Sequence, residues 1–87
     1  MFDKIKDDLL YLKEIGRLYD AEVSLACFDN FIKLPILNVR FIGPELMLEF
    51  DYGNMLYLTP YDIYTKEVNR YYIQQHETQR FMYLEIK

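Results

Sequence analysis

The chain has 87 residues, with 10 basic and 14 acidic side chains, one histidine and a formal net charge of −4. Apolar residues make up 52% of it, which excludes the composition of a disordered tail, and this length supports one domain, residues 1–87, with a radius of gyration of roughly 12 Å. No run approaches the roughly 20 consecutive apolar residues of a membrane span, and the mixed charges of the N-terminal segment predict a cytoplasmic protein rather than an exported one.

The N-terminal segment predicts an amphipathic helix. Aspartates lie near its start and basic residues near its end, an order that matches the helix dipole. We expect the helix to end between Ile15 and Tyr19, close to Gly16. The apolar side chains that recur at helical spacing, and so form its expected buried face, are Phe2, Ile5, Leu9, Leu12 and Tyr19.

The next segment, residues 21–28, alternates in the manner of a strand, although a short helix is an alternative interpretation. Asp29 and Asn30 are typical of a turn. The side chains expected on the inward side of this strand are Ala21, Val23, Leu25 and Cys27.

Three further runs alternate more clearly, at 36–42, 45–52 and 55–59. Gly43-Pro44 and Gly53-Asn54 separate them with two-residue turns. Successive alternating runs joined by tight turns predict an antiparallel meander, which we expect to form the centre of the sheet.

The segment Thr59-Pro60-Tyr61-Asp62 has the features of a helix start, with a threonine cap, a proline in the first turn and an acid three residues after the cap. We expect a helix from there to about Gln75, followed by a strand at 80–86. The predicted fold class is therefore α+β, an antiparallel sheet of four to five strands with two helices packed on one face, in the order α-β-β-β-β-α-β. The expected buried face of the second helix contains Tyr61, Tyr64, Val68, Tyr71 and Tyr72.

Groups that could perform catalysis are few. Cys27 and His76 could form a nucleophile–base pair, but Cys27 lies among apolar residues, as a buried structural thiol does, and His76 lies in a polar segment. Ser24 has no nucleophile-elbow context, and no two glycines lie close enough to form a phosphate-binding loop. One cysteine and one histidine cannot furnish a four-ligand zinc site. We therefore predict a protein that is not an enzyme, with no cofactor and no metal.

The middle of the chain carries the largest net negative charge, because residues 21–60 contain five acids and only two bases. Acids on the solvent face of a sheet ordinarily protect it from edge pairing, and the same face suits a basic patch on a partner protein. Glu49 and Asp51, about 7 Å apart along a strand, also have a spacing used by inverting glycosidases, but a chain of this length has little room for a substrate cleft. The predicted protein-binding residues are Glu45, Met47, Glu49 and Asp51, with Tyr52 and Tyr57 as aromatic anchors.

The chain contains nine tyrosines and no tryptophan. We expect at least half of the tyrosines to fill the helix–sheet interface. Tyrosine is also enriched at protein interfaces, and interleaved with basic residues it forms stacking platforms for single-stranded nucleic acid. The alternative function is therefore single-stranded nucleic-acid binding through Arg70, Tyr72 and Arg80. The negative net charge argues against it, because nucleic-acid affinity comes largely from cationic side chains.

The sequence thus predicts a small non-catalytic protein-binding module. Short acidic α+β domains without catalytic groups are typical of inhibitors and accessory proteins carried by phages and mobile elements, which act by occupying a partner surface. Such domains often bury excess aromatic surface between copies, so we also expect a homodimer.

Overall fold

One α-helix precedes eight strands in the residues that the computed structural model describes, which are 1–27 and 30–87, the side chain of Cys27 excepted. Short 3₁₀ turns, η1 (Leu18–Asp20) and η2 (Asp51–Gly53), lie between some of these elements. The elements in chain order are α1 (Phe2–Glu14), β1 (Ala21–Cys27), β2 (Asn30–Pro35), β3 (Asn38–Ile42), β4 (Glu45–Glu49), β5 (Met55–Leu58), β6 (Ile63–Lys66), β7 (Arg70–Gln74) and β8 (Phe81–Ile86).

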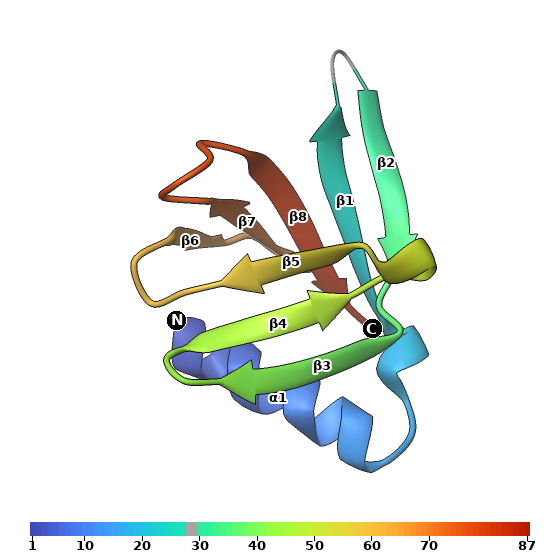
Figure 1. The fold of residues 1–87 in the computed structure, drawn as a ribbon. Helices are drawn as coiled ribbons and strands as arrows, with labels where there is room; N and C mark the ends of the chain where they lie inside the picture. Colours follow the sequence, from blue (N-terminus) through green and yellow to red (C-terminus); the bar gives the residue numbers. More distant parts are fainter. Residues whose placement is uncertain (28–29) are drawn as a thin grey trace.

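The strands form two antiparallel sheets. The larger has five strands in the order β2-β1-β8-β7-β6, and the smaller has three in the order β3-β4-β5. Figure 1 shows the smaller sheet in front of the larger, with α1 packed against β3. In the described part of the chain, no helix has the length and hydropathy needed to cross a membrane.

One cluster of buried side chains joins the helix to both sheets. Alternation along each strand turns every second side chain toward this cluster, and the helix adds one apolar stripe. The radius of gyration is 11.9 Å, close to the value expected for this length. The cluster contains Phe2, Ile5, Leu9, Leu12, Ala21, Val23, Ile36, Val39, Leu46, Leu48, Phe50, Leu56, Leu58, Tyr71, Ile73, Met82 and Leu84.

Much of the predicted α+β fold is confirmed. The first helix buries the predicted stripe except for Tyr19, which is exposed beyond the helix end. Strands are found at the three meander segments, and also where the β1 and β8 patterns predicted them. The meander is, however, a separate three-stranded sheet rather than the centre of a larger one. The predicted turn includes Asp29, which lies outside the described residues, and Asn30 is the first residue of β2. The predicted burial of the Cys27 thiol concerns a side chain that also lies outside the described part of the chain.

The helix predicted from residue 60 to Gln75 is wrong, and so is the order with two helices. These residues form the β6–β7 hairpin, in which Tyr64 pairs with Ile73. The segment is rich in aromatic and β-branched side chains, which favour strands. Val68, expected on a buried helix face, is almost fully exposed between the two strands, and Tyr61 is exposed before them.

The predicted helix cap nevertheless forms as an isolated turn. The Asp62 backbone N–H donates to the Thr59 carbonyl oxygen at 3.3 Å, and the Tyr61 N–H donates to the Thr59 hydroxyl at 3.2 Å. The Asp62 carboxylate in turn accepts the Thr59 N–H at 2.9 Å. The turn goes no further because the residues after Asp62 pair with β7, which places Tyr64 partly inside the shared core.

Candidate functional site

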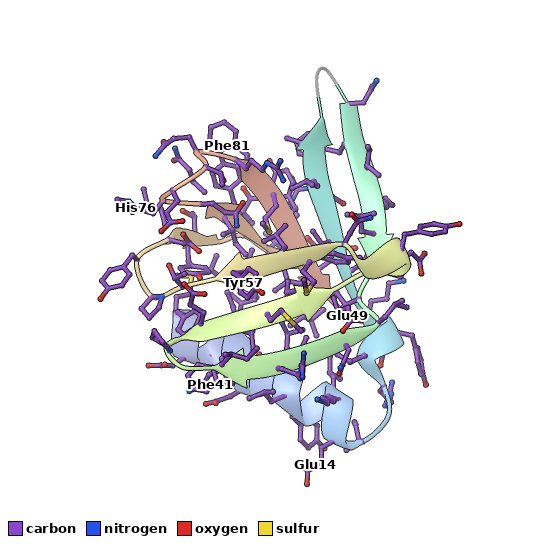
Figure 2. All side chains as sticks on the ribbon, viewed as in Figure 1. Glu14, Phe41, Glu49, Tyr57, His76 and Phe81 are labelled. Atoms are coloured by element: carbon purple, nitrogen blue, oxygen red, sulfur yellow. The ribbon has the colours of Figure 1, made fainter. Side chains whose placement is uncertain are left out.

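Four of the predicted binding residues lie together on the outer surface of the three-stranded sheet. In its register, Met47 lies opposite Tyr57 on one side and Arg40 on the other. Figure 2 labels Tyr57 and Glu49 on this sheet. We call this surface the acidic face; it comprises Arg40, Glu45, Met47, Glu49, Met55 and Tyr57.

The acidic face has a firm apolar centre. Met47 is only 1% exposed, although Leu46 and Leu48 on either side of it point into the core. Cross-strand neighbours on one face lie about 5 Å apart, which places the long side chains of Arg40 and Tyr57 on either side of Met47. Beside it, Tyr57 is 41% and Met55 53% exposed. Two side chains suited to an interface therefore stand on a packed base.

Asp51 lies beyond the end of the sheet, whereas the sequence predicts that it continues the strand face of Glu45, Met47 and Glu49, and Tyr52 lies on the same turn as Asp51. The chain leaves the sheet after Glu49 and enters η2, where Tyr52 has φ +61° and is fully exposed. Gly53 is also left-handed, at φ +73°, and the Asn54 amide donates to the Asp51 carbonyl oxygen at 3.0 Å. These local turn interactions end the alternation, so the expected pairing of Glu49 with Asp51 on one strand face is absent.

Arg40 is a member of the face that the sequence interpretation missed. The face therefore carries two carboxylates and one guanidinium rather than carboxylates alone. The turn sequence contains the signal that predicts this position of Arg40. A two-residue connection at Gly43-Pro44 pairs Ile42 with Glu45, and this register sets Arg40 beside Met47.

A cavity of about 350 Å³ opens at the β5 edge of the acidic face. Its walls come from β5, from the turn before β6 and from the β7–β8 loop, on which Figure 2 labels His76. The cavity brings Arg80, predicted for nucleic-acid binding, next to residues predicted for protein binding. The side chains used below that line it are Glu45, Tyr57, Tyr61, Glu77 and Arg80.

Two buried polar side chains hold the cavity walls together. Asp62 accepts the His76 backbone N–H at 2.8 Å through the carboxylate oxygen that does not bond Thr59. The Gln75 amide donates to the Tyr57 carbonyl oxygen at 3.1 Å. Through these bonds the end of β7 is fixed both to the turn before β6 and to the edge of β5. Sequence patterns could not reveal these bonds, because they join segments up to 18 residues apart.

Tyr64 packs beside this framework, with its ring 6.0 Å from the Phe2 ring. Its hydroxyl donates to the Thr59 carbonyl oxygen at 2.6 Å. Burial, and then the negative charge of Asp62, raise the pKa of Tyr64 well above that of a free tyrosine. The phenol therefore stays protonated in the folded protein through the whole neutral range.

A second group of side chains, two of them exposed and two half-buried, lies on the outer surface of the five-stranded sheet. The Tyr72 ring lies 5.4 Å from the Tyr83 ring and 5.7 Å from the Phe81 ring, and Phe31 lies 5.4 Å from Tyr83. The Arg70 guanidinium lies 3.7 Å from the centre of the Tyr83 ring. We call the four rings the aromatic face: Phe31, Tyr72, Phe81 and Tyr83.

The cations on this surface are already paired. Arg70 contacts Glu67 at 2.7 Å, and this hydrogen bond raises the pKa of Arg70. Lys33 on β2 lies 3.8 Å from Glu22. Of the residues predicted for nucleic-acid binding, the structure brings Arg70 and Tyr72 together and places Arg80 apart, at the cavity.

Neither catalytic groups nor comparisons point to a known activity. His76 is exposed, and within residues 1–26 and 30–87 no three His, Cys, Asp or Glu side chains gather where they could hold a metal ion. Comparison of the chain with protein-family models, curated proteins and solved structures found no match. The function is therefore argued from the two faces and the cavity.

Proposed function

We propose that this chain is a non-catalytic protein-binding module that occupies a surface of another protein through its acidic face and the adjoining cavity. The observation that carries this proposal is the position of Tyr57 and Met55, both exposed, on a packed base between Glu45 and Glu49. Aromatic and methionine side chains are enriched at interfaces and supply much of their binding energy.

The chemistry of the face defines the partner. The two carboxylates outnumber the single guanidinium of Arg40 on this face, and with Asp51 on the turn nearby they attract a basic surface and chiefly raise the association rate. The cavity beside Tyr57 has room for an apolar side chain of the partner, and exposed Tyr61 stands at its wall. The partner surface we expect is thus basic, with a protruding apolar residue. An inhibitor or accessory protein of a mobile element, located in the cytoplasm, fits this mode of action.

The aromatic face supports the second candidate, single-stranded nucleic-acid binding. Adjacent rings with a guanidinium over one of them are the parts of a base-stacking platform. Arg70 and Lys33 are, however, compensated by Glu67 and Glu22, and the whole chain has a charge of −4. Few counterions would then be released on binding a phosphate backbone. The observations therefore favour a protein partner.

Capture from a lysate of the source cells, with and without nuclease, tests the proposal. Tyr57→Ala is expected to weaken the captured protein's binding at least tenfold, as loss of a central aromatic residue does. Tyr11→Ala, which removes an exposed tyrosine of α1, is the matched control and is expected to change binding less than twofold. Glu49→Lys should slow association, whereas Glu14→Lys on the helix should not.

Two outcomes would contradict the proposal. One is a bound protein whose affinity is insensitive to both Tyr57→Ala and Glu49→Lys. The other is recovery of RNA or DNA that is lost on Tyr72→Ala and falls steeply with salt, which would establish the second candidate. Cys27→Ser, which removes the single thiol, is expected to leave capture unchanged because the proposal uses no nucleophile.

We also propose that the chain forms a homodimer. Large apolar side chains are exposed on both sheets, and two-fold dimers are the commonest arrangement that buries such surface. Light scattering at tens of micromolar protein is expected to give twice the chain mass of 10.6 kDa.

A further inference from the structure

The two sheets have four edge strands, and β2 is the least protected of them. At the edge of β3, the Lys13 ammonium donates to the Val39 carbonyl oxygen at 2.8 Å; at the edge of β5, Gln75 bonds the Tyr57 carbonyl oxygen at 3.1 Å. β6 has four residues, whereas β2 has six, five of them exposed. In Figure 1 the upper ends of β1 and β2 stand clear of the other strands.

The register shows which backbone groups of β2 are free. Pro35 lies opposite Glu22. Because proline has no N–H, these two residues form a non-hydrogen-bonded pair of the antiparallel ladder. Hydrogen-bonded and non-hydrogen-bonded pairs alternate along an antiparallel ladder, so Lys33 and Phe31 also belong to non-hydrogen-bonded pairs with β1. The backbone N–H and C=O groups of Lys33 and Phe31 therefore point away from β1. Among the described residues, no group is bonded to them.

We propose that β2 pairs antiparallel with β2 of a second copy, about a two-fold axis at Ile32, to give one continuous ten-stranded sheet. The inference rests on the homodimer proposed above and specifies its interface. In this register, Phe31 exchanges both backbone hydrogen bonds with Lys33 of the partner subunit, and Lys33 does the same with the partner's Phe31. Two free donors and two free acceptors are thereby satisfied on each copy.

Side-chain chemistry favours this register over one centred on Lys33, and it favours a second copy as the occupant. Moving the axis to Lys33 would set two ammonium groups directly opposite each other, which is unfavourable, and would pair Phe31 with a proline that cannot donate. With the axis at Ile32, that residue, 47% exposed in one copy, packs against the partner's Ile32. Phe31, 51% exposed, gains the partner's Lys33 as a neighbour on the outer surface. β2 is complementary to itself, as a two-fold interface requires.

Cysteine cross-linking tests the register. In a Cys27→Ser background, Ile32→Cys places two thiols in a non-hydrogen-bonded pair with Cα atoms about 4.5 Å apart, which a disulfide can span. Mild oxidation is expected to give a covalent dimer on a non-reducing gel. Asn30→Cys is the matched control: it is exposed, but its two copies would lie about 13 Å apart along the strands and should not cross-link.

The outcomes separate this inference from the general proposal of a homodimer. Dimeric mass by light scattering, cross-linking through Ile32→Cys, and at least a tenfold rise in the dissociation constant for Ile32→Lys would support the β2 interface. A dimer that cross-links equally through Asn30→Cys, or that Ile32→Lys leaves unchanged, would overturn the β2 interface and retain the homodimer. A monomeric wild-type chain would overturn both and would leave the β2 edge open to a strand of another protein.

Discussion

Replacing Asp62 with alanine removes one bond that closes the turn before β6 and one that fixes this turn to the end of β7. Its carboxylate accepts the Thr59 N–H at 2.9 Å and the His76 N–H at 2.8 Å. Hydrogen bonds to a charged acceptor contribute about 1.5–3 kcal/mol each. His76 is exposed, so water replaces part of its bond, and we expect a total loss of about 2–4 kcal/mol. A domain of this length has a free energy of unfolding of about 4–13 kcal/mol, so the substitution would remove a large part of the stability.

Urea unfolding followed by circular dichroism measures this loss. At a slope of about 1 kcal/mol per molar urea, the midpoint should fall by about 2 M or more. Glu77→Ala is the matched control, because it removes an exposed carboxylate from the same cavity and should change stability by no more than about 0.5 kcal/mol. A loss below about 1 kcal/mol for Asp62→Ala would refute the reasoning, since the cavity walls would then be held by other contacts. The Asp62 variant should also lose partner capture, because the cavity would lose its shape.

Two further predictions concern tyrosines. Tyr64→Phe should cost about 1 kcal/mol at pH 7 through the lost bond to Thr59. Because the folded-state pKa of Tyr64 is raised, the protonated phenol stabilises the fold fully below about pH 10, and this contribution declines above that pH. The stability cost of Tyr64→Phe should therefore shrink by up to about 1.4 kcal/mol per pH unit beyond pH 10. Equal costs at pH 7 and pH 11 in urea unfolding would contradict the burial of the phenol. Tyr52→Gly should raise stability by up to about 1 kcal/mol in the same assay, because Tyr52 has a left-handed φ of +61° and a fully exposed side chain. A destabilised variant would contradict this, since the tyrosine would then make a contact that compensates for its conformation.

The parts of the fold that could be predicted from the sequence are those set by local interactions. The stripe from Phe2 to Leu12 repeats at helical spacing, and the meander combines alternation with two-residue turns. β2 gave no such pattern, because five of its six side chains are exposed and its strand conformation depends on pairing with β1. The region from Thr59 to Gln75 was misassigned for a different reason. Its helix cap is real, but the aromatic spacing that suits a helix face also suits two short strands, and pairing decided between them.

The candidate site also has a part that local sequence patterns predict and a part that depends on tertiary contacts. Glu45, Met47 and Glu49 alternate on one strand, so their common face followed from periodicity alone. The cavity requires the β7–β8 loop to approach β5, which no local pattern specifies. The aromatic face likewise depends on β8 lying between β1 and β7, which brings Phe31 beside Tyr83 across 52 positions of sequence.

The central position of β8 has a consequence for how the chain is made. β1 and β2 can pair as soon as they leave the ribosome, and so can β6 and β7, but the two hairpins share no ladder until residues 81–86 arrive between them. Until those residues arrive, β1 presents an unpaired edge from an early stage of synthesis, and β7 presents one only while the short segment between Gln74 and Phe81 is made. Val23 and Ile73 then lack the strand that covers their flanks. The five-stranded sheet is thus completed when β8 inserts between β1 and β7. The interval before that step is when the nascent protein is most open to mispairing of its strands.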